Sequence, residues 1–200
     1  MFNLNLQTER LILKSFNKYS FSLTKIAKSM PFTKTNNYLK WFGDEEITKY
    51  NSHGLFPQSQ KELDTYYDRC ENDKSLLVFM IIEKKTNNHI GNCSLQRIDW
   101  INRSAEFAII IGEKNCWNKG YASEACDKLF EHGFLKLGLN RIWSGTSILN
   151  KGMIKVFEKL GMRKEGTYKQ GQFLNGEFHD VVIYAILKKQ WELLKWKQGK

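Results

Sequence analysis

The feature that most constrains the fold is an apolar strand that ends in a glycine and leads, through a short loop, into a long amphipathic helix. The strand is expected over Arg103–Gly112, the loop over Trp117–Ala125 and the helix over Gly120–Leu137. The first amides of a helix have no intrahelical partner, and the helix dipole adds partial positive charge there. Gly120 lets the backbone approach a ligand closely, and Lys119 adds a positive charge. The arrangement therefore predicts an anion-binding site.

The loop taken alone is equally compatible with a plain strand-to-helix turn. It is not a Walker loop, because no G-K-[ST] follows its glycine, and it lacks the G-x-G-x-x-G pattern of dinucleotide-binding folds. The type of anion must be inferred from the rest of the chain.

The rest of the chain predicts a single domain over residues 1–200. No Gly/Ser-rich linker or internal repeat interrupts the 200 residues, and Asn175-Gly176 is a two-residue hairpin signal. The order of the expected elements indicates an α+β fold, in which helices cover a mixed sheet. Further strands are expected at Arg10–Lys14, Leu76–Glu83, His89–Asp99, Arg141–Ser147, Thr167–Phe173 and Phe178–Leu187, and further helices at Gln58–Asn72, Lys151–Leu160 and Lys188–Trp196.

Composition narrows the class of protein. The net charge of +10 fits a nucleic acid, an anionic membrane, an anionic small molecule or a solvated lysine-rich surface, but no dense basic block is interleaved with aromatics. The four cysteines form no C-x-x-C pair, so no metal site is predicted, and scattered thiols fit a cytoplasmic protein. The sequence begins without a recognisable signal peptide, and its longest apolar run, Leu76–Ile82, is too short to span a membrane.

Four segments, in order along the chain, carry a resemblance to a known family. They are Thr8–Leu13 (TERLIL), Asn102–Phe107 followed by Ile109–Gly112, Trp117–Ala125 (WNKGYASEA), and Asn150 with Val156–Met162 (VFEKLGM). Together they resemble the GNAT superfamily of N-acetyltransferases, in the branch of ribosomal-protein-alanine and related enzymes.

This resemblance implies a mostly antiparallel mixed sheet with a splayed cleft, covered by helices on both faces. It implies an enzyme that moves an acetyl group from acetyl-CoA, as co-substrate, to a primary amine by direct attack in a ternary complex. The backbone of the strand would pair with the pantetheine arm, the loop amides would hold the pyrophosphate, and Asn150 would bind near the pantetheine or acetyl end with Phe157 nearby. The strand residues are Ile109, Ile110 and Ile111, and the loop residues are Asn118, Lys119, Gly120, Tyr121, Ala122 and Ser123. Homodimers are common in this superfamily.

The chain departs from the family pattern at three positions. Asn118 replaces a glycine, and asparagine tolerates the left-handed conformation better than most residues do. Met153 and Phe157 stand where relatives have a serine or a tyrosine proposed to protonate the departing thiolate. Neither side chain can donate a proton, so the general acid is not identified, and a non-catalytic acetyl-CoA-binding module is the alternative. Nucleic-acid binding, from the net charge, is a further alternative.

Two residues are candidate catalytic groups. Glu106 is a carboxylate in an otherwise apolar strand, and alternation places it on one face with Ala108 and Ile110. It is the first candidate for the base, directly or through a water, and the alternative is an ion pair with Arg103 or Arg141. Tyr184, in the last strand, is a candidate proton donor to the thiolate, and an ordinary core tyrosine is an equal interpretation.

The acceptor amine is less well determined than the donor. His53, Trp100 and Asn102 lie in loops expected to flank the acceptor cleft, so they are candidate substrate contacts. The stretches around Trp100–Phe107 and His53 resemble family members that act on surface-polysaccharide precursors, which suggests a nucleotide-linked amino sugar. A protein N-terminus is a second option. A polyamine or an aminoglycoside is disfavoured because a strongly basic enzyme repels polycations.

Overall fold

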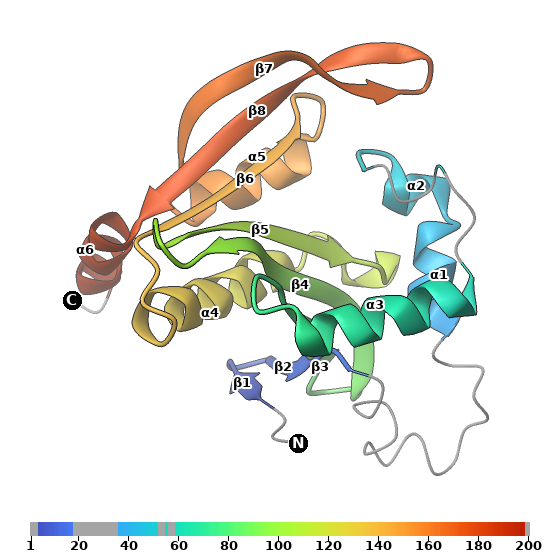
Figure 1. Ribbon diagram of the computed structural model, residues 1–200, viewed down its shortest axis with the longest axis horizontal. Coiled ribbons are helices and arrows are strands. Elements are labelled where there is room, and N and C mark those ends of the chain that lie inside the picture. The colour runs from blue at the N-terminus through green and yellow to red at the C-terminus, as the bar shows by residue number, and fades with distance from the viewer. Residues whose placement is uncertain (1–3, 18–35, 52–54, 56–58, 199–200) are drawn as a thin grey trace.

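The protein, seen in a computed structural model that describes residues 4–17, 36–51, 55 and 59–198, is built on one eight-stranded sheet (Figure 1). The strand order is β1-β2-β3-β4-β5-β6-β8-β7, and only the β5–β6 pair is parallel. The strands are β1 (Asn5–Gln7), β2 (Leu11–Ser15), β3 (Leu77–Glu83), β4 (Asn88–Asp99), β5 (Ser104–Ile111), β6 (Arg141–Ser147), β7 (Arg163–Leu174) and β8 (Glu177–Leu187). The mixed, mostly antiparallel sheet predicted from the sequence is confirmed.

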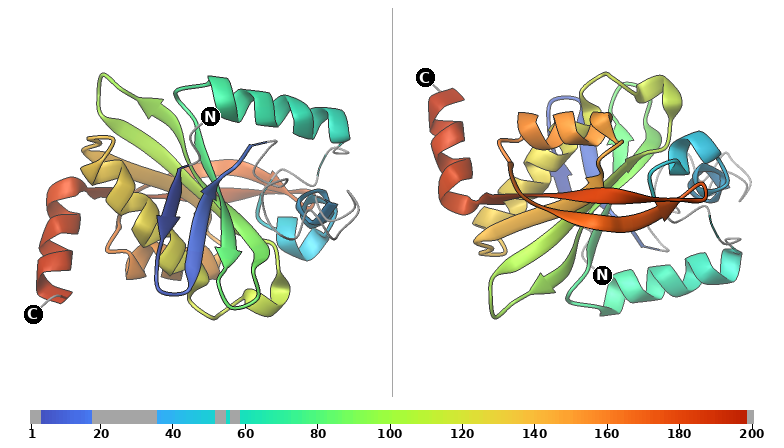
Figure 2. Two further views of the ribbon diagram at one scale, coloured as in Figure 1. Left: turned by 90° about the horizontal axis from the view of Figure 1, so that it is seen from below. Right: turned by 90° about the horizontal axis from the view of Figure 1, so that it is seen from above.

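Helices cover both faces of this sheet (Figure 2). One face carries α4 and α5, and the other carries α3, which begins with a capping box between Ser59 and Glu62. No helix within the described residues is both long and apolar enough to cross a membrane. The helices are α1 (Asn36–Phe42), α2 (Glu45–Thr48), α3 (Gln60–Asn72), a 3-10 turn (Lys114–Cys116), α4 (Tyr121–Leu135), α5 (Lys151–Lys159) and α6 (Lys188–Gln198).

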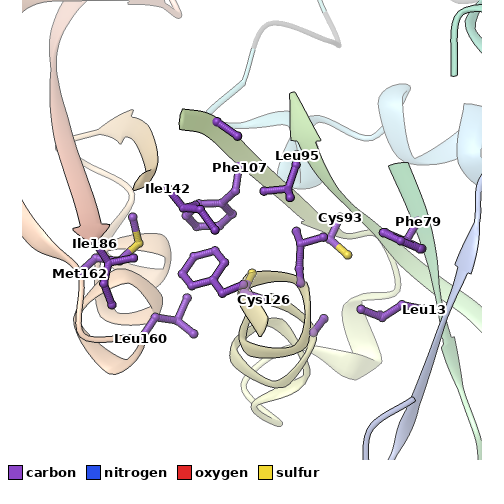
Figure 3. Close-up of a cluster of buried hydrophobic side chains, with 14 of the residues drawn as sticks. Leu13, Phe79, Cys93, Leu95, Phe107, Cys126, Ile142, Leu160, Met162 and Ile186 are labelled. Carbon is purple, nitrogen blue, oxygen red and sulfur yellow. The ribbon is translucent and has the colours of Figure 1, made fainter. Parts of the chain in front are cut away.

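The main core lies between the sheet and α4 (Figure 3). Phe107 from β5 packs edge-on against Phe130 of α4 and Phe157 of α5, with ring centroids 5.0 and 5.7 Å apart. All three rings are fully buried, as are Leu95 and Ile142 beside them. Burial of this much apolar area fixes α4 against β5, and so fixes where the amino end of α4 lies.

The parallel pair β5–β6 is short and then opens. Its register includes only three residue pairs, from Ser104↔Arg141 to Glu106↔Trp143. Beyond Glu106, β5 stays paired with β4 on one side, while β6 stays paired with β8. The two strands visibly part in Figure 1, which confirms the splayed sheet that the family resemblance implies.

The structure differs from the sequence prediction mainly at the edges of the sheet. The short strand β1 was not predicted, and β7 extends from Arg163 to Leu174 with a register shift between Tyr168 and Gln172. The hairpin turn at Asn175-Gly176 is confirmed, since both residues have the positive φ that such a turn needs, 52° and 87°.

Candidate active site

The amino end of α4 is open to a ligand. Gly120 is its N-cap with φ 79°, and no side chain caps the helix. The amide of Glu124 makes the first intrahelical bond, to the Gly120 carbonyl, so the amides of the three preceding helical residues have no acceptor within α4. Asn118 adopts φ 60°, as expected for a residue that replaces a glycine there. The backbone therefore offers several N–H groups and the positive end of a 15-residue helix.

Two cationic side chains lie beside these amides. A Cβ atom built on Gly120 would stand 3.6 Å from Nη2 of Arg10 and 3.9 Å from Nζ of Lys159. Arg10 is held in place because it donates to the Lys119 carbonyl and to the Glu124 carboxylate. The amino end of α4 is thus positively charged beyond what its dipole supplies.

The Thr8–Leu11 (TERL) segment contacts the first turn of α4. Thr8 Oγ1 and the backbone amide of Arg10 both donate to Oε1 of Glu124, in the first turn of α4. This network ties the start of β2 to the helix end where an anion would bind. Tyr121 completes it, since its ring lies under Arg10, 4.5 Å away, and its hydroxyl donates to Glu83.

One edge of β5 has backbone groups available for pairing beyond Glu106. The Gly112 amide donates to the Ile90 carbonyl of β4, and the Arg103 carbonyl accepts from Asn140 at the start of β6. Strand alternation then directs the backbone groups of Ile109 and Ile111 into the gap toward β6, and those of Ile110 toward β4. Of the four backbone groups on the gap side, the Ile111 carbonyl already accepts from the Trp117 indole at 2.7 Å.

Glu106 lies where the gap begins, with its side chain on the sheet face opposite Phe107, as alternation predicted. Its side chain is only 17% exposed, and burial raises the pKa of the carboxyl above its ordinary 4.5. Arg97, 3.2 Å away, and Gln96 both oppose this rise, the first by charge and the second by a hydrogen bond. The ion-pair partner is therefore Arg97, and not Arg103 or Arg141. Arg97 is 75% exposed, so solvent weakens its attraction.

A cleft of about 400 Å³ lies on the Glu106 face of the sheet. Its floor is formed by β4 and β5, and its walls by α1 and α3. Three polar residues of β4 form part of the floor, namely Asn92, Ser94 and Gln96, beside Ala108 and Ile110 of β5.

The sequence interpretation did not identify these β4 residues. The signal that marks them is the alternation of polar residues with Cys93 and Leu95, which face the α4 core. Polar side chains on the inner face of a central strand indicate a binding surface.

Three residues predicted to serve the site, Asn150, Phe157 and Tyr184, lie in or near α5. Asn150 caps α5, since its Oδ1 accepts from the Met153 amide while its Nδ2 donates to Thr146. Phe157 is fully buried in the core, and the Tyr184 ring lies 5.1 Å from it. Asn150 therefore caps a helix and Phe157 packs in the core. Tyr184 is a buried core residue, and its role as a general acid stays a prediction.

The predicted substrate contacts in loops are not brought to the cleft. Trp100 and Asn102 lie in the β4–β5 turn, where the Trp100 indole donates to the Lys74 carbonyl and the Asn102 amide donates to Asp99. Neither is part of the cleft lining. His53 lies outside the described residues.

The thiols of the protein are not activated. Burial raises the pKa of Cys70 to about 12, and it also raises the pKa values of Cys93, Cys116 and Cys126. A protonated thiol is a poor nucleophile, so these cysteines lack the activation that a catalytic thiol requires. In the part of the chain that the structure describes, no group of three or more His, Cys, Asp or Glu side chains is arranged to hold a metal ion.

Comparison with known proteins identifies the family. Residues 31–163 match the family model described as an acetyltransferase (GNAT) domain. An uncharacterized N-acetyltransferase p20 from Bacillus licheniformis is 35% identical over 76% of this chain and 86% of that protein. The putative ribosomal N-acetyltransferase YdaF from Bacillus subtilis is 37% identical over 51% of this chain and 55% of that protein. Spermidine N(1)-acetyltransferase from Vibrio cholerae is 30% identical over 67% of this chain and 76% of that protein.

Solved structures share the fold. Spermidine N-acetyltransferase from Vibrio cholerae, in complex with CoA and spermine, aligns with a TM-score of 0.76 over 92% of this chain and 99% of that one, at 24% identity. A GNAT-family acetyltransferase from Bacillus anthracis aligns with a TM-score of 0.72 over 93% of this chain and 99% of that one, at 23% identity.

Proposed function

Because this chain belongs to the GNAT family and is an acetyl-CoA-dependent N-acetyltransferase, we propose that it acetylates a primary amine held in the cleft beside Glu106. The observation that carries the proposal is the position of Glu106. Its carboxylate lies where β5 and β6 separate, and it is the cross-strand neighbour of Gln96, which lines the cleft.

The donor side of the proposed site is the amino end of α4. The amides from Asn118 to Ser123 hold the pyrophosphate of acetyl-CoA, and Arg10 and Lys159 add charge beside it. The pantetheine arm runs along the gap edge of β5 and pairs with the backbone of Ile109 and Ile111. This directs the thioester toward Glu106, because β5 runs from the gap's origin to the α4 loop.

The chemistry proposed for Glu106 is general-base catalysis. The amine nitrogen attacks the thioester carbonyl carbon, and a gap-facing backbone N–H of β5 stabilises the oxyanion that forms. Glu106 accepts the amine proton, directly or through a water, and a carboxyl with a raised pKa suits this task. Collapse of the intermediate breaks the carbon–sulfur bond and releases the thiolate of CoA. Tyr184 is the proposed proton donor to that thiolate, since Met153 and Phe157 carry no acidic proton.

The acceptor is proposed to be a nucleotide-linked amino sugar. Arg69, paired with Asp73, is part of the cleft lining, and Arg97, paired with Glu106, flanks it, so two largely exposed guanidinium groups lie near an anionic portion of the substrate. A protein N-terminus is the second candidate, and the likeness to a putative ribosomal N-acetyltransferase favours it. Several relatives are named spermidine N-acetyltransferases, which makes spermidine the necessary comparison in any test.

The test is release of free CoA thiol from acetyl-CoA across a panel of amines. The panel holds a uridine-diphosphate-linked amino sugar, a peptide with a free N-terminus, spermidine and an aminoglycoside. We expect turnover with one of the first two. Tight acetyl-CoA binding with no thiol release on any amine would favour a non-catalytic binding module instead.

A further inference from the structure

Asn92, in the floor of the cleft, has an unused hydrogen-bond donor. The residue is 6% exposed, and within the described residues its Nδ2 has no hydrogen-bond partner. A buried amide N–H₂ group without an acceptor costs free energy, so such a group in a binding cleft calls for a ligand atom to complete it.

His89 fixes the direction in which this donor points. Its Nε2 lies 3.0 Å from the Gly91 carbonyl and 2.6 Å from Oδ1 of Asn92. Both neighbours are acceptors, so Nε2 must carry the proton. Burial lowers the pKa of His89 to about 4, which keeps the ring neutral at physiological pH. Oδ1 of Asn92 is thereby committed to His89, and Nδ2 is the atom left for another partner.

The charge around the cleft indicates what kind of partner this is. Among the described residues that line it, Glu62 is the only carboxylate and Arg69 the only cation. The Glu62 side chain already accepts from the Ser59 amide at 2.6 Å. A polyamine carries several positive charges and is best matched by several carboxylates, whereas the Asn92 amide and the Ser94 hydroxyl on the cleft floor suit a neutral polar group.

We propose that Asn92 is a specificity-determining residue that donates from Nδ2 to an oxygen of the acceptor, a carbonyl or a hydroxyl several bonds away from the reacting amine, because Asn92 lies four residues along β4 from Gln96, which faces Glu106. This inference rests on the proposed function and adds the substrate class to it. The same chemistry is present in an amino sugar, which offers hydroxyls, and in a peptide N-terminus, which offers its backbone carbonyls.

Four amines test this assignment by thiol release. Glucosamine and alanyl-alanine amide carry the oxygen, and hexylamine and spermidine do not. The variants are Asn92→Asp, which keeps the shape and the bond from His89 but removes the N–H₂ donor, and Asn92→Leu, which removes both polar atoms. The wild type should prefer one of the two oxygen-bearing amines at least tenfold in kcat/KM, and the better one identifies the source of the oxygen.

In both variants the KM for the preferred amine should rise at least tenfold, with the KM for acetyl-CoA unchanged. Asn92→Asp should in addition gain activity on spermidine, because it adds a carboxylate. Retention of the wild-type preference in both variants would overturn the assignment. So would a wild type that prefers spermidine or hexylamine.

A second measurement separates failure of Asn92 from failure of the proposed function. The side-chain amide signals of Asn92 are followed by NMR while glucosamine or alanyl-alanine amide is added to the wild type with CoA bound. If no amine is acetylated, the proposed reaction fails, and a shift of these signals with either compound still supports the Asn92 site. Absence of a shift with both compounds overturns it.

Discussion

Glu106 and Trp143 are the last facing residues at which β5 and β6 pair. The position matters because the half-buried carboxylate lies at the point where the two strands begin to separate. A register shift in β4 between Gln96 and Asp99, with φ 49° at Arg97, brings the Arg97 guanidinium to 3.2 Å from Glu106. The protein thus places its candidate base where the parallel strands part, and supplies it with one exposed cation.

Replacement of Glu106 by Gln should lower kcat by about 100-fold or more, the range expected for loss of a general base. The affinity for acetyl-CoA should stay within twofold of the wild-type value, because Glu106 does not lie at the amino end of α4. Steady-state kinetics and a direct binding titration measure the two quantities. A variant with wild-type rates across pH would show that Glu106 is not the base.

Replacement of Arg97 by Gln should move the acid limb of the kcat/KM profile to higher pH. Arg97 stabilises the ionised carboxyl, so its loss allows burial to raise the pKa of Glu106 further. The base must be ionised to act, and the enzyme should therefore lose activity at a higher pH than the wild type does. An unchanged pH profile would show that Arg97 does not affect the pKa of the catalytic base.

Lys159→Gln should weaken acetyl-CoA binding about three- to fivefold, because an exposed cation beside Gly120 would be lost. The difference from the wild type should shrink as salt is added. Lys136→Gln is the matched control, since Lys136 is the C-cap at the opposite end of α4. Equal effects of the two substitutions would contradict a cofactor phosphate at the amino end of α4.

Gly112→Ala should destabilise the fold by about 1–3 kcal/mol, the usual cost of overpacking. A Cβ atom there would lie 1.9 Å from Cδ2 of Trp41, which packs against the end of β5. Gly166→Ala is the control, since a Cβ atom at that position meets nothing within 4 Å. Chemical denaturation of both variants measures the difference. Similar stability losses would show that Trp41 does not restrict this position.

Acid should destabilise the protein through His89. Its pKa is lowered to about 4 in the folded state from 6.5, so the unfolded chain binds a proton first as pH falls. Stability of about 3 kcal/mol, present above pH 6.5, should be lost between pH 6.5 and 4. A His89→Gln variant should show a correspondingly flatter dependence over this window. Parallel curves for the two proteins would contradict a half-buried His89 that stays neutral in the folded protein.

The parts of the fold with strong local signals were predictable from sequence. The strand Arg141–Ser147 was predicted with the bounds that it has, and the open helix start at Gly120 follows from glycine and loop chemistry. The strand β1 was missed because three residues at a sheet edge carry no clear period. The register shift in β7 was missed because Asp180 supports it from another strand, by contacts with Lys169 and Gln170.

In the candidate site too, some features were predictable from sequence and others were not. Strand alternation predicted which face of the sheet carries Glu106. The ion-pair partner of Glu106 was not predictable, because Arg97 reaches it only through the irregularity in β4. Arg141, one of the partners expected from sequence, instead forms an ion pair with Glu165 at the base of β7. Long-range pairs of this kind depend on register, which the spacing of charged residues does not reveal.

The most direct test of the account is a crystal structure of the protein with acetyl-CoA bound. We predict that the pyrophosphate lies on the amides at the start of α4, the pantetheine pairs with Ile109 and Ile111, and the thioester carbon lies within one water molecule of the Glu106 carboxylate. Acetyl-CoA bound with its thioester away from the point where β5 and β6 separate would contradict the account.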